Sequence, residues 1–187
     1  MISIKKIFSK PIEGPSLRMR LIELSDAAYV HGLRTNPVYN QYLSTVDGTV
    51  LDQRRWIETY KHREAMGQEL YFIIERRDGT PCGTVRLYDI NAECFTWGSW
   101  ILDHNKPHKA ALESAFLIYK SAFDLLKLSE ARFDVRRDNE NTLAFHRRFG
   151  ATEIHADEQD VFFVYPNTRF AADQGSYLAI LECENPA

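Results

Sequence analysis

Cysteine is scarce in this sequence. The three cysteines, Cys82, Cys94 and Cys183, lie far apart along the chain, and no two of them form a C-x-x-C pair. An odd number of widely spaced thiols indicates neither a disulfide framework nor a structural zinc site. Reduced thiols are the simpler interpretation, and they are typical of a cytoplasmic protein.

A long hydrophobic run is also missing. No segment approaches the roughly 20 apolar residues that a membrane-spanning helix needs. The first ten residues, MISIKKIFSK, contain no apolar run long enough for a signal peptide. We therefore expect a cytoplasmic protein that has no membrane partner.

A basic excess is missing as well. The formal net charge of −3 argues against a general nucleic-acid binder, because such proteins usually carry a positive excess. The rest of the composition, with 44% hydrophobic and 26% charged residues, is ordinary for a folded protein. The 187 residues fit a single domain, 1–187, that can bury a sizeable core without disulfides.

Hydrophobic periodicity and turn residues predict a mixture of strands and helices. The predicted strands are 17–24, 70–77, 82–90, 94–102, 131–135, 161–165 and 177–183. The predicted helices are 26–35, 52–67, 110–126 and 140–149. The segment 38–51 is predicted to be a loop or a broken helix, and 166–175 is predicted to be a loop. This order indicates an α/β fold of the layered α+β kind, with a largely antiparallel sheet and helices on both of its faces.

The segment RRDNENTLAFHRRFGATE, residues 136–153, combines polar and aromatic residues in a predicted helix that ends at a glycine. The pattern within it consists of Asn139, Thr142, Phe145, His146, Arg148 and Gly150. Together with the order of elements, this pattern resembles the GNAT superfamily of acyl-coenzyme A-dependent N-acyltransferases, over about residues 17–183. Within that superfamily the chain looks most similar to acetyltransferases of ribosomal proteins, small molecules and amino sugars on a nucleotide carrier.

The resemblance implies that acetyl-coenzyme A, as co-substrate, lies in a gap between two splayed central strands. Its pantetheine arm would follow the strand 94–102 at Trp100, Ile101 and Leu102, whose free backbone groups would bind the pantetheine amides. Its diphosphate would lie at the next loop and helix N-terminus, where backbone amides and the helix dipole favour anions. The residues implied there are Asn105, Lys106, His108, Lys109 and Ala110.

This loop departs from the family pattern because it lacks glycine. His108 stands at the position of the first family glycine, and Pro107 removes one amide donor. Cationic side chains could replace the lost amides by charge. The alternative is a plain polar loop that begins a long helix. His104 and His108 stand four residues apart, but Pro107 interrupts a helical display and no third ligand is evident, so we expect no metal site.

Two residues match family positions for acid–base chemistry. Asp134 stands where several relatives have a glutamate that deprotonates the amine, and its shorter side chain would need a relaying water. The alternative is that Asp134 balances Arg132 and Arg136 on a strand face. His146 stands where many relatives have a tyrosine that protonates the departing thiolate, a step that imidazole can perform with its ordinary pKa of roughly 6.5. The alternative is a packed core histidine.

Further coenzyme contacts are implied around the same helix. Asn139 would bind the pantetheine or position the loop, and Phe145 would line the coenzyme site. Arg148 could reach the 3′-phosphate or the adenine, with simple solvation at the surface as the alternative.

The implied acceptor is the primary amine of a small molecule, attacked directly in a ternary complex, with an amino sugar on a nucleotide carrier as the leading hypothesis. Candidates for the acceptor wall are Tyr39, Tyr42, Trp97 and the loop 166–175, with Arg34, Arg86 and Arg169 for a base and a diphosphate.

Two alternatives stay open. The first is a protein N-terminal or lysine acetyltransferase, for which Glu153, Asp157, Glu158 and Asp160 could line an acidic groove. The second is a non-catalytic coenzyme A-binding sensor. A homodimer is common in the family, but no residue of this sequence indicates one.

Overall fold

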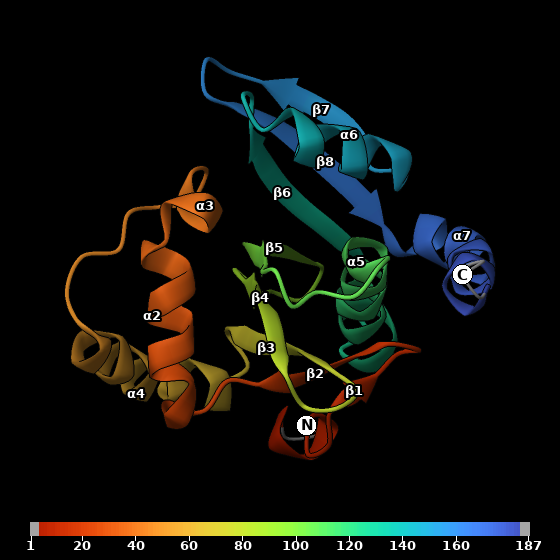
Figure 1. Cartoon of the computed structure of the whole chain (residues 1–187). Coiled ribbons are helices and arrows are strands. Elements are labelled where there is room, and N and C mark those ends of the chain that lie inside the picture. The colour runs from red at the N-terminus through yellow and green to blue at the C-terminus, as the bar shows by residue number, and fades with distance from the viewer. Residues whose placement is uncertain (1–3, 184–187) are drawn as a thin grey trace.

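The computed structural model describes residues 4–183, which form one eight-stranded sheet with helices on both faces (Figure 1). The strand order is β1-β2-β3-β4-β5-β6-β8-β7. Neighbouring strands are antiparallel, apart from the parallel pair β5 and β6. The strands are β1 Ile12–Glu13, β2 Leu17–Leu21, β3 Leu70–Arg76, β4 Pro81–Tyr88, β5 Cys94–Leu102, β6 Glu130–Arg136, β7 Thr152–Ala156 and β8 Asp160–Pro166.

The helices divide between the two faces of this sheet (Figure 1). They are α1 Ile4–Ile7, α2 Ala27–Thr35, α3 Pro37–Asn40, α4 Val50–Ala65, α5 Ala110–Lys120, α6 Glu140–Arg148 and α7 Asn167–Glu182. In β3, Leu70, Phe72 and Ile74 belong to the core that α5 covers. Tyr71 and Ile73, which point to the other face, belong to the core that α2 and α4 cover. The predicted fold class is therefore confirmed.

The central strands β5 and β6 are splayed. Within residues 4–183 they pair only where they begin, at Cys94 with Glu130 and at Phe95 with Ala131. Beyond Phe95 the two strands separate, and β5 continues to pair with β4 on its other side as far as Leu102. The predicted gap in the sheet is present, and the backbone of β5 faces it.

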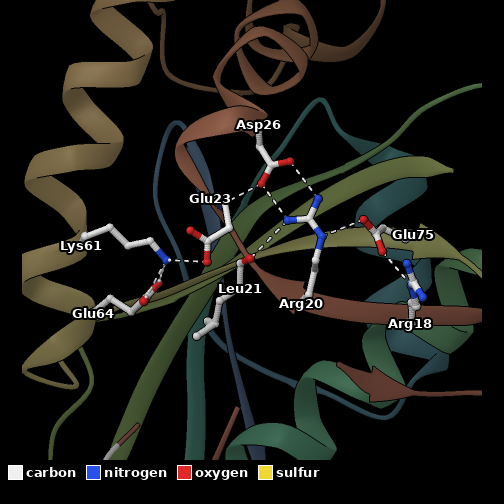
Figure 2. Close-up of polar contacts among 8 residues, drawn as sticks. All are labelled: Arg18, Arg20, Leu21, Glu23, Asp26, Lys61, Glu64 and Glu75. Atoms are coloured by element: carbon white, nitrogen blue, oxygen red, sulfur yellow. Dashed lines mark hydrogen bonds and ion pairs between the residues drawn. The ribbon is translucent and has the colours of Figure 1, made fainter. Parts of the chain in front are cut away.

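An ion-pair network fixes the start of α2 against the sheet (Figure 2). The buried carboxylate of Glu75 in β3 accepts hydrogen bonds from Arg18 and Arg20 of β2, each at 2.7 Å. Arg20 also donates to both oxygens of Asp26 at 2.7 and 2.8 Å, in the turn that precedes α2. This network anchors the turn that precedes α2 to the sheet.

The predicted strand 177–183 and the predicted loop 166–175 are wrong. Nearly all of both segments lies in one helix, α7, which packs against α5 and buries Phe170, Tyr177 and Leu181. The apolar run YLAILE fits a strand and a helix alike, and only its packing partner decides between them. The segment 166–175 therefore does not form a loop beside the acceptor site.

Other elements can also be compared with the predictions. The helix α4 begins at Val50, because Thr49 is its N-cap and forms a capping box with Asp52, the residue predicted to open it. The segment 38–51, predicted to be a loop or a broken helix, contains most of the short helix α3 and the first two residues of α4. The exposed strand β7 was not predicted. Among residues 4–183, no helix combines the length and the apolar character that crossing a membrane requires.

Candidate active site

A cavity of about 310 Å³ lies in the gap between β5 and β6. Trp97, Gly98, Ser99 and Trp100 line it from β5, and residues 133–136 line it from β6. Asn139, Thr142 and His146 line it from α6 and from the residue that precedes this helix. We call this space the wedge cavity. It brings together four of the predicted site residues: Trp100, Asp134, Asn139 and His146.

A β-bulge distorts β5 beside the wedge cavity. Ser99 and Trp100 lie opposite the single residue Val85, because Ile101 pairs with Thr84 and Gly98 pairs with Arg86. Ser99 has a φ of 47°, a left-handed conformation that is uncommon for a residue other than glycine. The hydroxyl of Thr84 donates to the carbonyl of Ser99 at 3.0 Å and helps to hold this geometry. Backbone strain of this kind is often found at functional sites.

Asp134 lies at the rim of the wedge cavity. Partial desolvation, together with repulsion by Asp160, raises the pKa of the Asp134 carboxyl above its ordinary value. A raised pKa makes this carboxylate a better proton acceptor. Tyr88 of β4 lines the same cavity, and its hydroxyl lies over Gly98, where a Cβ atom would come within 3.1 Å of the oxygen. Burial and the charge of Asp134 both raise the pKa of Tyr88.

His146 forms part of the aromatic floor of the wedge cavity. It is 3% exposed, and its ring lies 4.5 Å from the ring of Phe133 and 5.3 Å from the ring of Trp97. Burial lowers the pKa of His146 to about 3, so the imidazole is neutral at pH 7. Its Nδ1 is buried and has no hydrogen-bond partner among residues 4–183. This environment fits the alternative interpretation of His146 as a packed core histidine. A neutral imidazole has no imidazolium proton to donate to a thiolate.

The other residues predicted near α6 lie in different surroundings. The side chain of Asn139 caps α6, accepting from the backbone N–H of Thr142 at 3.2 Å. Phe145 is half-buried with its ring 5.1 Å from that of Trp100, but it does not line the wedge cavity. Arg148 is exposed on α6 and does not line this cavity either.

Along β5, Ile101 and Leu102 continue beyond the wedge cavity toward the glycine-poor loop 103–109. The buried carboxylate of Asp103 shapes the start of this loop, where it accepts the backbone N–H of Asn105 at 2.7 Å and the hydroxyl of Tyr29 at 2.8 Å. Because Tyr29 belongs to α2, the loop is tied to the helical layer on the opposite side of the gap.

The end of the loop is tied to α7. Lys109 has a φ of 63°, and its ammonium donates to the carbonyls of Ile180 and Cys183, at 2.8 and 2.7 Å. The cation therefore stabilises the C-terminal end of α7 and is directed away from the place that the resemblance implied. Lys106 and His108 are exposed on the loop, and the buried Ala110 begins α5.

A second cavity, of about 470 Å³, adjoins the first. It lies between the α2–α4 layer and the sheet, and Gln53, Trp56, Tyr71 and Arg86 form part of its wall. We call it the helix-side cavity. Three residues line both cavities, which makes the two spaces contiguous: Arg34, Ser44 and Ser99.

Sequence reasoning overlooked three residues at this junction. Ser44, Tyr88 and Ser99 were not among the predicted site residues, and they come from a loop and from two strands that are brought together only by folding. The signal available for Ser99 was the local sequence WGSW, which interrupts an otherwise apolar strand. Of the wall candidates, Tyr42 and Trp97 do line the wedge cavity.

The comparisons with known proteins agree with this geometry. A family model described as an acetyltransferase (GNAT) domain matches residues 16–152. The solved structure of FdhC, described as a nucleotide-linked sugar GNAT, is similar with a TM-score of 0.85 and 37% identity, over 92% of this chain and 98% of that chain. A comparison with curated proteins found no significant match.

More distant structures share the fold. A spermidine N-acetyltransferase from Vibrio cholerae, in complex with CoA and spermine, is 18% identical with a TM-score of 0.72, over 84% of this chain and 99% of that chain. A ribosomal-protein-S5-alanine acetyltransferase from Vibrio fischeri is 14% identical with a TM-score of 0.72, over 84% and 97%. Since the family model covers most of the sequence and the gap between β5 and β6 is open, the chain belongs to the GNAT family of N-acetyltransferases.

Proposed function

We propose that this protein transfers an acetyl group from acetyl-coenzyme A to a primary amine of a small molecule. The observation that carries the proposal is the pair of contiguous cavities. The wedge cavity, with the free edge of β5 beside it, suits the pantetheine arm and the thioester. The helix-side cavity suits an acceptor, and the two meet at the strained bulge of Ser99.

The reaction needs an uncharged amine and a polarised thioester carbonyl. In our proposal Asp134 accepts the proton of the substrate ammonium through a water molecule. The amine nitrogen then bonds to the thioester carbon, and the carbon–sulfur bond breaks. The nitrogen releases its second proton to solvent, and coenzyme A leaves as a thiolate that takes a proton from solvent. Backbone amides of the bulge at Ser99 and Trp100 are the candidates to polarise the carbonyl. His146 of α6 and Trp100 of β5 contribute neutral walls beside the thioester.

The coenzyme diphosphate would lie at the loop 103–109 and the first turn of α5, with Asn105, Lys106, His108 and Ala110 around it. Ile101 and Leu102 would bind the pantetheine by their backbone groups. Asn139, Phe145 and Arg148 would support the coenzyme from the α6 side. Lys109 would take part indirectly, because its ammonium holds α7.

As acceptor we propose an amino sugar on a nucleotide carrier. The support is the 37% identity with FdhC, which is described as a nucleotide-linked sugar GNAT and which the chain matches almost end to end. The alternatives are a protein N-terminal or lysine acetyltransferase and a coenzyme-binding sensor. The acidic residues suggested for a peptide groove lie in or beside the exposed β7–β8 hairpin, and Asp160 is paired with Arg136.

The test is release of free thiol from acetyl-coenzyme A with a panel of acceptors: nucleotide-linked amino sugars, free amino sugars, polyamines and short peptides. We expect turnover with the nucleotide-linked amino sugars. At a hundred times its dissociation constant, acetyl-coenzyme A should stabilise the fold by about 2.7 kcal/mol, which is roughly 5–10 °C in Tm for a chain of this size. A shift in Tm without thiol release from any acceptor would support the sensor, and no shift would reject the coenzyme site.

Asp134→Asn should lower kcat by on the order of 100-fold, because an amide cannot accept the proton. For the wild type, kcat/KM should fall on the acid side around a pKa that is raised above the ordinary carboxyl value, since protonation removes the base. The matched control is Glu130→Gln, which removes a carboxylate from the same strand outside both cavities. Equal effects of the two substitutions would remove Asp134 from the mechanism.

A further inference from the structure

Arg34 stands at the junction of the two cavities and has no carboxylate partner among residues 4–183. One terminal nitrogen donates to the carbonyl and the hydroxyl of Ser44, at 3.0 and 2.9 Å. The other lies 3.5 Å from the hydroxyl of Ser99, at the limit of a hydrogen bond. Its Nε is shielded from solvent and has no partner in the described part of the chain.

The other arginines on this side of the molecule are compensated. Arg18 and Arg20 share the carboxylate of Glu75, as Figure 2 shows. Arg86 lines the helix-side cavity like Arg34, but it donates to Glu69 at 2.6 Å. A half-buried guanidinium that lines two cavities and has no carboxylate partner among residues 4–183 is poised to bind an anion.

The carboxylates around the junction do not provide that anion. Asp47 and Asp52 line the helix-side cavity but are exposed at its rim, and Asp52 is engaged by Thr49 and Arg55. Asp134 lies in the wedge cavity and forms no ion pair with Arg34. The anion therefore has to come from a ligand.

The ligand is the acceptor, if the proposed function holds. The part of acetyl-coenzyme A that enters the wedge cavity is the pantetheine arm with its thioester, which is uncharged. We propose that Arg34 binds an oxyanion of the acceptor, a phosphate or a carboxylate, and thereby sets the specificity for anionic amines. Because the guanidinium of Arg34 lies 3.5 Å from the hydroxyl of Ser99, an oxyanion bound to it is held close to the bulge where the amine must attack.

The segment 41–48 takes part in this site. It has no regular secondary structure, it lines both cavities, and Arg34 holds its middle residue, Ser44. Because the Nε of Arg34 is shielded, a bidentate oxyanion reaches it only if this segment shifts. Loops that close over a bound substrate move in this way.

The test compares acceptors that differ in charge. Thiol release is measured with an amino sugar on a nucleoside diphosphate, with an amino sugar that carries a carboxylate, and with a neutral methyl glycoside of the same amino sugar. Each is assayed with the wild type, Arg34→Gln, Arg34→Lys and the matched control Arg63→Gln, which changes an arginine that lines neither cavity. We expect Arg34→Gln to lower kcat/KM for an anionic acceptor by about 10- to 100-fold relative to the neutral one. Arg34→Lys should retain part of the preference. Arg63→Gln should change the ratio by less than about twofold, because its guanidinium is already paired with Glu69 at 3.1 Å.

Affinity gives a second readout that does not depend on turnover. Calorimetry with the nucleoside diphosphate amino sugar should show weaker binding to Arg34→Gln by about tenfold or more, and a weaker salt dependence. Whether Arg34→Gln affects the nucleoside diphosphate acceptor or the carboxylate acceptor more strongly shows which oxyanion Arg34 binds. If Arg34→Gln lowered activity equally with charged and neutral acceptors, or left binding unchanged, Arg34 would only hold the segment 41–48 and the inference would be wrong. Absence of thiol release from every acceptor would instead reject the proposed function.

Discussion

At the scale of single residues, surroundings decide the chemistry of the wedge cavity. Desolvation raises the pKa of Asp134 and lowers that of His146. Both shifts favour the uncharged form, but they have opposite consequences for catalysis. The carboxylate becomes a better base, whereas the imidazole loses the proton that would have made it an acid. This contrast supports our proposal that Asp134 accepts the proton of the amine.

The buried imidazole predicts an acid-sensitive fold. Its pKa is about 3 in the folded protein and about 6.5 when unfolded, so the unfolded chain takes up a proton first as the pH falls. The contribution of this neutral imidazole to the free energy of unfolding is fully present above pH 6.5. It decreases as the pH falls below 6.5, by roughly 2 kcal/mol between pH 7.5 and pH 5. His146→Phe should remove this part of the pH dependence.

Urea denaturation of the wild type and of His146→Phe, each at pH 7.5 and pH 5, measures the difference. Other titrating groups contribute to both proteins and cancel in the comparison. Parallel losses of stability in the two proteins would mean that the imidazole is accessible to protons.

At the scale of elements, side chains define the loop 103–109 at both of its ends. Asp103 fixes the start through Tyr29, and Lys109 fixes the end through the last turn of α7. A loop that lacks glycine can therefore still have a defined shape beside the N-terminus of α5. In our proposal the coenzyme diphosphate binds there, beside Lys106 and His108.

Lys109→Gln should destabilise the fold by about 1–2 kcal/mol, because two carbonyls at the end of α7 lose a charged donor. The dissociation constant for coenzyme A should change by less than about twofold, since the ammonium faces α7. Lys106→Gln, in the same loop, is the matched comparison and should weaken coenzyme binding severalfold with little effect on stability. Thermal unfolding and calorimetry separate the two, and the reverse pattern would place Lys109 on the diphosphate.

At the scale of the whole molecule, the wedge cavity and the helix-side cavity meet at one junction. In our proposal the α2–α4 layer forms the acceptor side, and the network of Glu75 joins this layer to the sheet (Figure 2). The position of Arg34 near the end of α2 depends on how the start of that helix is held. A change at the network should therefore affect both stability and acceptor binding.

Glu75→Gln leaves two guanidinium groups without their shared carboxylate and should cost about 2 kcal/mol, less than a fully buried pair because Arg18 and Arg20 are partly exposed. Glu58→Gln is the matched control, since its partner Arg54 is 3.7 Å away and both side chains are about half exposed. It should change stability by less than about 0.5 kcal/mol. Urea denaturation compares the two variants. Equal decreases in the free energy of unfolding would show that the network stabilises the fold no more than an exposed ion pair does.

The amino-acid sequence by itself determined the family, the fold class and most strands, because periodicity and the motif from Asn139 to Gly150 are local properties. It also identified four residues that line one cavity: Trp100, Asp134, Asn139 and His146. These residues were predicted because they match family positions, either in the motif from Asn139 to Gly150 or in the order of strands.

Only the tertiary structure decided the rest. Burial made His146 neutral, packing on α5 made 167–182 a helix, and hydrogen bonds to α7 turned Lys109 away from the loop. These outcomes depend on contacts between residues far apart in the chain, which no local pattern contains. The tertiary structure also decides that Arg34 has no carboxylate partner among residues 4–183, because a counterion is a neighbour in space and not in sequence.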